Sequence, residues 1–138
     1  MNNPTNDQIR DMLATAGVIA VVGHSDKPYR TSYQIAQFLR HNGYKVYPVN
    51  PSVSEINGEK SYASLADIPE AIDIVNVFRR PEHLKGVTAE AISIGAGAVW
   101  GQLGVVDEDA AEMAAEAAMP AVMDRCIKIE HQRLMPVR

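Results

Sequence analysis

The sequence has 138 residues, of which 46% are hydrophobic and 22% charged, and its formal net charge is -4. This size and composition predict a single globular domain over residues 1–138, long enough to bury a substantial core. The acidic balance argues against a general binder of nucleic acid or of anionic membranes, because such proteins normally carry a basic excess. The single cysteine excludes an internal disulfide framework. No apolar run approaches the ~20 residues that span a bilayer, and the polar N-terminus does not have the pattern of a signal peptide, so we expect a cytoplasmic protein.

The N-terminal segment, residues 1–15, is expected to form a short helix ahead of a core that spans residues 16–134. Thr5 and Gln8 have the spacing of a capping box, in which each side chain satisfies a free backbone amide of the other. The helix is expected to stop at Gly17.

The core is expected to begin with a strand of five apolar residues, Val18–Val22, a run typical of strands buried on both faces. Gly23 ends this strand, where the backbone can turn sharply or approach a ligand closely. A short basic loop follows, and Thr31 or Ser32 is expected to cap the next helix, which runs to about Asn42, with Gly43 in the left-handed position after it. A strand, a glycine, a basic loop and a helix N-terminus together form an anion site, because free helix amides point at the loop. We therefore expect this loop to hold the phosphates of a nucleotide-like ligand.

Strands and helices alternate along the rest of the chain. Further strands are expected at residues 44–49, 72–78, 98–100 and 121–123. Helices are expected after Pro81, after the capping residue Asp107, and over residues 127–134, with Pro136 ending the last one. Residues 52–60 are expected to form a loop with a tight turn at Asn57-Gly58, and residues 62–68 stay open between an edge segment and a helical turn. The alternation predicts an α/β fold with a doubly wound, Rossmann-like, mostly parallel sheet of five or six strands.

In such a sheet the residues that follow each strand gather at one edge, where ligands bind. The candidate site residues are Gly23, His24, Ser25, Lys27 and Arg30 after the first strand, Val49, Asn50 and Pro51 after the second, Phe78, Arg79 and Arg80 after the third, and Gly101 and Gln102 after the fourth. Five of the 13 basic residues follow strands, namely Lys27, Arg30, Arg79, Arg80 and Arg125. Several such groups together indicate a polyanionic ligand, although exposed strand ends are often charged for no functional reason.

Other nucleotide and hydrolytic sites fit the residues less well. A dinucleotide fingerprint needs three glycines in the first turn, but Ser25 and Pro28 stand where two of them would fall. No carboxylate follows the second strand, and the P-loop pattern is absent. The segment from Gly23 to Lys27 begins like the nucleophile elbow of serine hydrolases but ends in lysine. The histidines show no pairing at metal spacing, and only His24 is expected in the pocket.

Cys126 has two interpretations. A lone cysteine is most often a small buried residue, which is the interpretation we favour. It also follows a strand beside Arg125, a setting that lowers the pKa of a thiol and raises its reactivity.

Five motifs at successive strand ends resemble one family, that of the small stand-alone CoA-binding proteins related to the N-terminal domain of the succinyl-CoA synthetase alpha subunit. The motifs are Val21-Val22-Gly23-x-Ser25, Gly43-Tyr44-x-Val46-Tyr47-Pro48-Val49-Asn50-Pro51, Asp73-Ile74-Val75-x-Val77-Phe78-Arg79-Arg80-Pro81, Val99-Trp100-x-Gln102-x-Gly104 and Asp124-Arg125-Cys126. The resemblance covers nearly the whole chain, from Ala16 to Leu134.

The resemblance implies that coenzyme A is the ligand and assigns parts of it to the strand ends. The first loop would hold the CoA phosphates, through Gly23, Ser25, Lys27 and Arg30. The turn from Val49 to Pro51 would lie against the adenine end, the turn from Phe78 to Arg80 would line the cleft, and the Gly101-Gln102 turn would lie nearer the pantetheine arm.

Two departures from the synthetase bear on function. The synthetase has a lysine just after its second-strand turn, where this chain has Ser52 and Val53. Its phosphorylated histidine belongs to a second domain that this sequence does not contain, so the ligase reaction is not expected. The sequence therefore predicts a module that binds CoA or an acyl-CoA without catalysis of its own. The alternatives are an enzyme that uses CoA and Cys126 in acyl transfer or thiol–disulfide chemistry, and a binder of NADP or another nucleotide. The sequence does not identify a protein partner.

Overall fold

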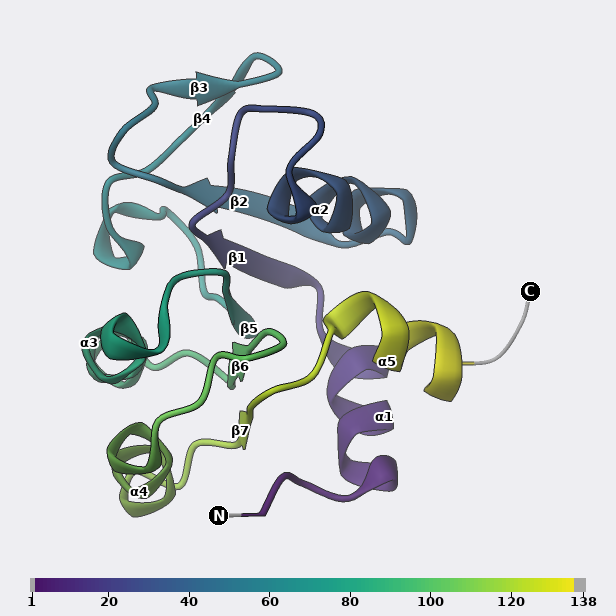
Figure 1. Ribbon diagram of the computed structural model, residues 1–138, viewed down its shortest axis with the longest axis vertical. Helices are drawn as coiled ribbons and strands as arrows, with labels where there is room; N and C mark the ends of the chain where they lie inside the picture. Colours follow the sequence, from purple (N-terminus) through teal and green to yellow (C-terminus); the bar gives the residue numbers. More distant parts are fainter. Residues whose placement is uncertain (1, 136–138) are drawn as a thin grey trace.

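A five-stranded parallel sheet forms the centre of the protein, whose computed structural model describes residues 2–135 (Figure 1). In chain order the strands are β1 (Val18–Val22), β2 (Lys45–Val49), β5 (Ile74–Val77), β6 (Val99–Gly101) and β7 (Ala121–Val122). They lie in the order β2-β1-β5-β6-β7, and every neighbouring pair is parallel. The predicted α/β class and the doubly wound, Rossmann-like sheet are thereby confirmed.

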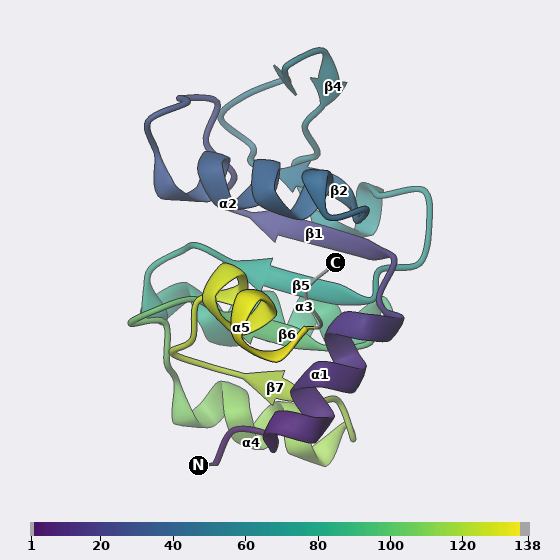
Figure 2. The ribbon, with the colours of Figure 1, turned by 90° about the vertical axis from the view of Figure 1, so that its right-hand side faces the viewer.

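Helices cover both faces of this sheet (Figures 1 and 2). One face carries α1 (Asn6–Thr15), α2 (Thr31–His41) and α5 (Ile127–Leu134), and the other carries α3 (Leu84–Ser93) and α4 (Glu108–Glu116), with the 3-10 turns η1 (Leu65–Asp67) and η2 (Pro81–His83). In β1 the side chains alternate between these two apolar layers, with Ile19 and Val21 in one and Ala20 and Val22 in the other. The prediction that Val18–Val22 forms a strand buried on both faces is confirmed.

The order of the strands creates a switch point. From β1 the chain crosses through α2 to β2 on one side, and it returns to β5 on the other side of β1. The connections therefore leave the carboxyl ends of β1 and β5 in opposite directions, which opens a crevice where ligands bind in sheets of this kind.

A small hairpin lies outside the main sheet, within the segment that we expected to be a loop. Its strands, β3 (Glu55–Ile56) and β4 (Glu59–Lys60), pair antiparallel. The predicted tight turn is confirmed, because Asn57 and Gly58 both have positive φ, 53° and 82°. The strands were missed because two residues each, mostly charged, give no alternation of apolar and polar positions. In the segment left open, Tyr62 makes an isolated bridge to Val49, and η1 follows.

The helix ends were predicted in most cases. The capping box of Thr5 and Gln8 is present, and the Asp107 carboxylate accepts a hydrogen bond from the Ala110 amide. The cap predicted for α2 is wrong: Arg30 occupies the N-cap position and makes no side-chain hydrogen bond there. The stop predicted at Pro136 lies outside the described residues. Within residues 2–135 we find no helix with the length and apolar character needed to cross a bilayer.

Candidate functional site

A cavity of about 420 Å³ opens at the switch point, where β1, β2 and β5 end. Seven of the predicted site residues line it, namely Gly23, Val49, Asn50, Pro51, Phe78, Arg79 and Arg80. They come from three separate strand ends, as the parallel topology requires. The structure thus brings together more than half of the predicted set around one space.

Gly23 lies where the ends of β1 and β5 come close together. Its φ is 89°, and a Cβ on it would lie 3.3 Å from Cγ of Arg79 and 3.4 Å from the backbone carbonyl of Phe78. Its amide donates to the carbonyl oxygen of Val49 at 2.9 Å. Gly23 therefore lets the ends of β1, β2 and β5 meet closely, which no residue with a side chain would allow without strain.

Two serine hydroxyl groups, one in the first loop and one in the first turn of α2, hold the backbone of the first loop. The Ser25 amide donates to Oγ of Ser32 at 3.0 Å, and the Lys27 amide donates to Oγ of Ser25 at 3.0 Å. The hydroxyl predicted to cap α2 thus fixes the loop in front of the helix instead. Lys27 and Arg30 are exposed and lie outside the cavity lining. Within residues 2–135, neither side chain has a carboxylate within 4 Å.

Asn50 connects the first and second loops. Its Nδ2 donates to the carbonyl oxygen of His24 at 2.9 Å, while its Oδ1 accepts from the Ser52 amide at 2.9 Å. The Phe78 amide donates to the carbonyl oxygen of Val22 at 2.8 Å. The walls of the cavity are therefore joined by hydrogen bonds rather than formed by independent loops.

His24 does not line the cavity. Its ring is fully buried, with Nδ1 2.8 Å from the carbonyl oxygen of Ser25 and Nε2 3.2 Å from Nη2 of Arg40 in α2. Burial lowers the pKa of His24 to about 4, and the Arg40 charge adds to this effect against an opposing hydrogen bond to the Ser25 carbonyl. The imidazole is therefore neutral at physiological pH.

Other residues line the cavity that sequence reasoning missed. His83 of η2 and Val87 and Glu90 of α3 form part of the wall, together with Ser52 and Ala63. The expectation that His24 is the one histidine in the pocket is wrong, because His83 lines the cavity and His24 does not. The spacing of Leu84, Val87, Ala91 and Ile94 predicts the apolar stripe of this helix, and Leu84 and Ala91 are buried as expected while Val87 and Ile94 are partly buried. The stripe does not show which neighbouring positions line the cavity.

Gly101 and Gln102 are buried and lie outside the cavity lining. A Cβ on Gly101 would lie 2.5 Å from the carbonyl oxygen of Val105, so a tight turn requires this glycine. Oε1 of Gln102 accepts from Nδ2 of Asn76 at 3.1 Å and from the Ile127 amide at 3.0 Å. This side chain is committed to joining the sheet to α5.

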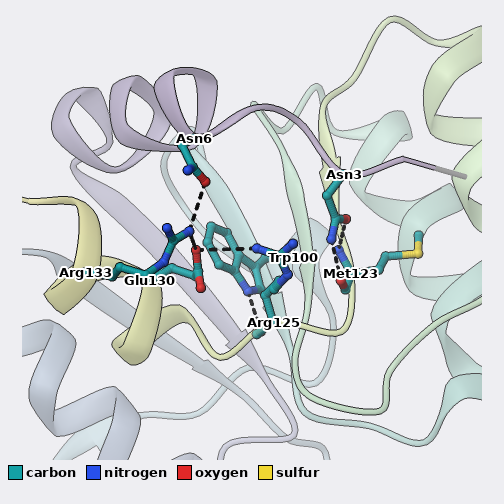
Figure 3. Close-up of polar contacts among 7 residues, drawn as sticks. All are labelled: Asn3, Asn6, Trp100, Met123, Arg125, Glu130 and Arg133. Atoms are coloured by element: carbon teal, nitrogen blue, oxygen red, sulfur yellow. Dashed lines mark hydrogen bonds and ion pairs between the residues drawn. The ribbon is translucent and has the colours of Figure 1, made fainter.

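Two further candidates, Cys126 and Arg125, lie at the start of α5, on the face of the sheet that α1, α2 and α5 cover. Cys126 is buried in the apolar cluster under α2 and α5, and it lies outside the cavity lining. Nη1 of Arg125 lies 3.6 Å from a carboxylate oxygen of Glu130, in a polar cluster on α5 (Figure 3). Arg125 therefore does not join the other basic residues expected at the strand ends.

A larger cavity, of about 670 Å³, lies between α1, α2 and α5. Among the described residues, 2–135, its lining includes Phe38, Tyr44 and His131 and contains no lysine or arginine. The smaller cavity at the switch point, by contrast, is lined by Arg79 and Arg80. Within residues 2–135, no three histidine, cysteine or carboxylate side chains gather as metal ligands.

Residues 17–132 match the family described as "CoA binding domain". The chain belongs to this CoA-binding domain family. The resemblance drawn from the five strand-end motifs is thereby confirmed, and CoA binding is supported at the level of the family.

One curated relative aligns with nearly the whole chain, and another aligns with about half of it. The uncharacterized protein YneT of Bacillus subtilis is 44% identical over 131 residues, which are 95% of this chain and 97% of YneT. The alpha subunit of the ADP-forming acetate–CoA ligase II of Pyrococcus furiosus is 34% identical over 73 residues, which are 52% of this chain but only 16% of that subunit.

Solved structures confirm the fold. A hypothetical protein from Pyrococcus horikoshii superimposes with a TM-score of 0.93 at 37% identity, covering 99% of this chain and 98% of its own. A protein described as Prb, the PH1109 protein redesigned for binding, superimposes with a TM-score of 0.95 at 38% identity, covering 100% of this chain and 97% of its own.

Proposed function

We propose that this protein binds coenzyme A, or an acyl-CoA, in the cavity between the carboxyl ends of β1, β2 and β5. The observation that carries the proposal is the meeting of Gly23 with Phe78 and Arg79 at the switch point of the sheet, beside a cavity of about 420 Å³. Close backbone approach and a guanidinium group at one place suit a phosphate ligand. Membership of the CoA-binding domain family supports CoA as that ligand.

The charges around the cavity favour a polyanion. Arg79 and Arg80 line it, and Lys27 and Arg30 extend from the neighbouring loop. Since the net charge of the chain is -4, this gathering of positive charge is local. CoA carries a pyrophosphate and a 3′-phosphate, and arginine binds such groups through two parallel hydrogen bonds.

We assign the nucleotide end of CoA to the part of the cavity lined by Asn50, Pro51 and Ser52, a cavity that His83 and Glu90 also line. Nδ2 and Oδ1 of Asn50 are both engaged within the protein, so this residue shapes the wall rather than donating to the ligand. Ser52 stands at the position where the related synthetase has a lysine. The 3′-phosphate would then depend on the arginines of the cavity and of the first loop.

A binding role is favoured over thiol chemistry at Cys126. Exchange with a disulfide requires an accessible thiolate, and this side chain is 8% exposed within an apolar cluster on the other face of the sheet. We therefore propose no catalytic step for this residue.

Isothermal titration with CoA, acetyl-CoA, dephospho-CoA and NADP tests the proposal. We expect saturable 1:1 binding of CoA, similar binding of acetyl-CoA and weaker binding of dephospho-CoA. Arg79→Ala is expected to weaken CoA binding about tenfold, since it removes a charge-assisted contact to phosphate. Arg10→Ala, which removes an arginine from α1, is the matched control and is expected to leave CoA affinity unchanged. Binding of NADP but not of CoA would overturn the proposal.

A further inference from the structure

His24 is fully buried directly beside the proposed phosphate loop, yet its ring faces α2 and not the cavity. Three hydrogen bonds hold it. Its carbonyl oxygen accepts from Asn50, its Nδ1 meets the Ser25 carbonyl at 2.8 Å, and its Nε2 meets Nη2 of Arg40 at 3.2 Å. Both ring nitrogens therefore have partners within the protein, as a buried imidazole requires.

These partners determine the tautomer of the ring. A guanidinium group can only donate hydrogen bonds, so Nε2 must be the unprotonated acceptor. A carbonyl oxygen can only accept, so Nδ1 must carry the proton. The contacts of Ser25 and Arg40 therefore require one neutral tautomer, with the hydrogen on Nδ1.

Arg40 extends the contact from His24 to the hairpin formed by β3 and β4. Its Nη2 lies 3.7 Å from a carboxylate oxygen of Glu59 in β4, and its Nη1 donates to Gln37 at 2.7 Å. Nη2 of Arg40 therefore contacts both Nε2 of His24 and Oε2 of Glu59.

A second contact joins the hairpin to α2 at the same place. Nδ2 of Asn57, in the hairpin turn, donates to the Tyr33 hydroxyl at 2.7 Å. The Tyr33 ring in turn packs edge-on against the His24 ring, with centroids 6.0 Å apart. Figure 1 shows the hairpin and the loop before α2 projecting at the same end of the sheet.

The base of the hairpin is part of the cavity wall. Residues 50–52 line the cavity and are separated from β3 by two residues, and Oγ of Ser61, just after β4, donates to the Asn50 carbonyl oxygen at 3.0 Å. A displacement of the hairpin would therefore move one wall of the cavity.

We propose that His24 is a positioning residue: as a neutral acceptor it orients Arg40, and through Arg40 and Tyr33 it docks the β3–β4 hairpin at the edge of the cavity. The docking itself does not depend on the ligand. Its consequence for affinity rests on the proposed function, because the docked hairpin fixes the wall against which CoA binds.

Nuclear magnetic resonance of the ligand-free protein tests the first step. Long-range 15N–1H correlation is expected to show His24 protonated at Nδ1 at pH 7, the minor tautomer of free histidine. Protonation at Nε2 instead would contradict the proposal, because Arg40 could not then donate to that atom.

Amide hydrogen exchange of the ligand-free protein tests the docking. In Asn57→Gly, which keeps the left-handed turn but removes the donor to Tyr33, and in Glu59→Gln, exchange across residues 54–61 is expected to accelerate about tenfold. The strands β1 and β5 serve as internal references and are expected to keep their protection. His24→Gln is expected to rescue the docking that His24→Phe loses, because an amide can donate and accept in the same place. His131→Phe is the matched control on the same face of the sheet.

CoA titration of the same variants separates this proposal from the proposed function. Weaker CoA binding in the undocked variants supports both. Undocking with unchanged CoA affinity would overturn the coupling to the cavity but leave CoA binding intact. Absence of CoA binding in the unmodified protein would refute the proposed function without affecting the exchange result. Unchanged hairpin exchange in both hairpin variants would refute the docking.

Discussion

Two groups of basic side chains in this protein differ in how they are paired. The first group, called here the cavity cations, comprises Arg79 and Arg80, which line the cavity, and Lys27 and Arg30 on the first loop beside it. The second group, the α5 cations, comprises Arg125 and Arg133, which share the carboxylate of Glu130 (Figure 3). Glu130 is 7% exposed, and Arg133 also donates to Asn6 of α1.

The difference separates a structural use of arginine from a ligand-binding one. A buried carboxylate requires cations to offset its loss of hydration, so the α5 cations are committed to the fold. Of the cavity cations only Arg80 has a carboxylate within 4 Å in the described residues, and that contact with Glu82 is exposed and weak. Positive charge without a partner is available to an anionic ligand. Arg40 represents a third case, since a neutral imidazole accepts from it.

Removing Glu130 is expected to have the largest effect. Glu130→Ala leaves both α5 cations unpaired and loosens α5 from α1, so the free energy of unfolding should fall by about 3 kcal/mol. Urea denaturation measures this loss. Glu112→Ala on the exposed surface of α4 is the control and should change the unfolding free energy by less than about 0.5 kcal/mol. A similar loss in both variants would contradict the structural role of the α5 cations.

Acid is expected to weaken the contact between His24 and Arg40. The pKa of His24 is about 4 in the folded protein against 6.5 for an ordinary histidine, so the unfolded chain binds more protons between these values. The free energy of unfolding should therefore fall as the pH is lowered from about 6.5 to 4, by roughly 2–3 kcal/mol, with no further His24 contribution below that range. Denaturation across this pH range, compared with His24→Gln, measures the difference. Parallel pH profiles for the two proteins would show that His24 is not the group responsible.

Gly23→Ala is expected to affect both stability and binding. The positive φ and the contact at 3.3 Å from Arg79 oppose any Cβ, so the unfolding free energy should fall by about 1–2 kcal/mol. CoA affinity should fall as well, since the strand ends must separate. Gly86→Ala, in α3 with open space around it, provides the control. A fully stable Gly23→Ala variant with normal CoA binding would contradict the close approach of the strand ends.

Arg79→Ala is expected to have the smallest effect on stability and a clear effect on binding. The exposed side chain has no carboxylate partner within residues 2–135, so the unfolding free energy should change by less than about 0.5 kcal/mol. CoA affinity should fall by about 1.4 kcal/mol, which corresponds to a factor of ten. Thermal denaturation and titration of the same sample separate the two quantities. A large loss of stability without loss of affinity would place Arg79 with the α5 cations.

The strands and their order of appearance could be predicted because buried parallel strands are short apolar runs bounded by glycine, asparagine or proline. Val18–Val22 and the residues after it show this most clearly, and the candidate site followed from the rule that strand ends share an edge. Gly23, Asn50 and Arg79 were found in this way, and all three line one cavity.

The remaining features depend on side-chain direction, which the spacing of residue types does not determine. His24 and Gln102 follow strands as expected, but their side chains turn into the protein toward Arg40 and Asn76. His83 and Glu90 line the cavity because of how η2 and α3 dock on the sheet. Arg125 could not be separated from the cavity cations by sequence, because its partner Glu130 is recognisable only once α5 is in place.

Mapping of backbone amide shifts during titration with CoA tests the central claim most directly. We expect saturable changes confined to residues 23–30, 49–52 and 78–90, with the amides of α1 and of the polar cluster around Glu130 unaffected. Changes centred on the larger cavity between α1, α2 and α5, or no saturable change at all, would contradict the assignment of the cavity cations to CoA.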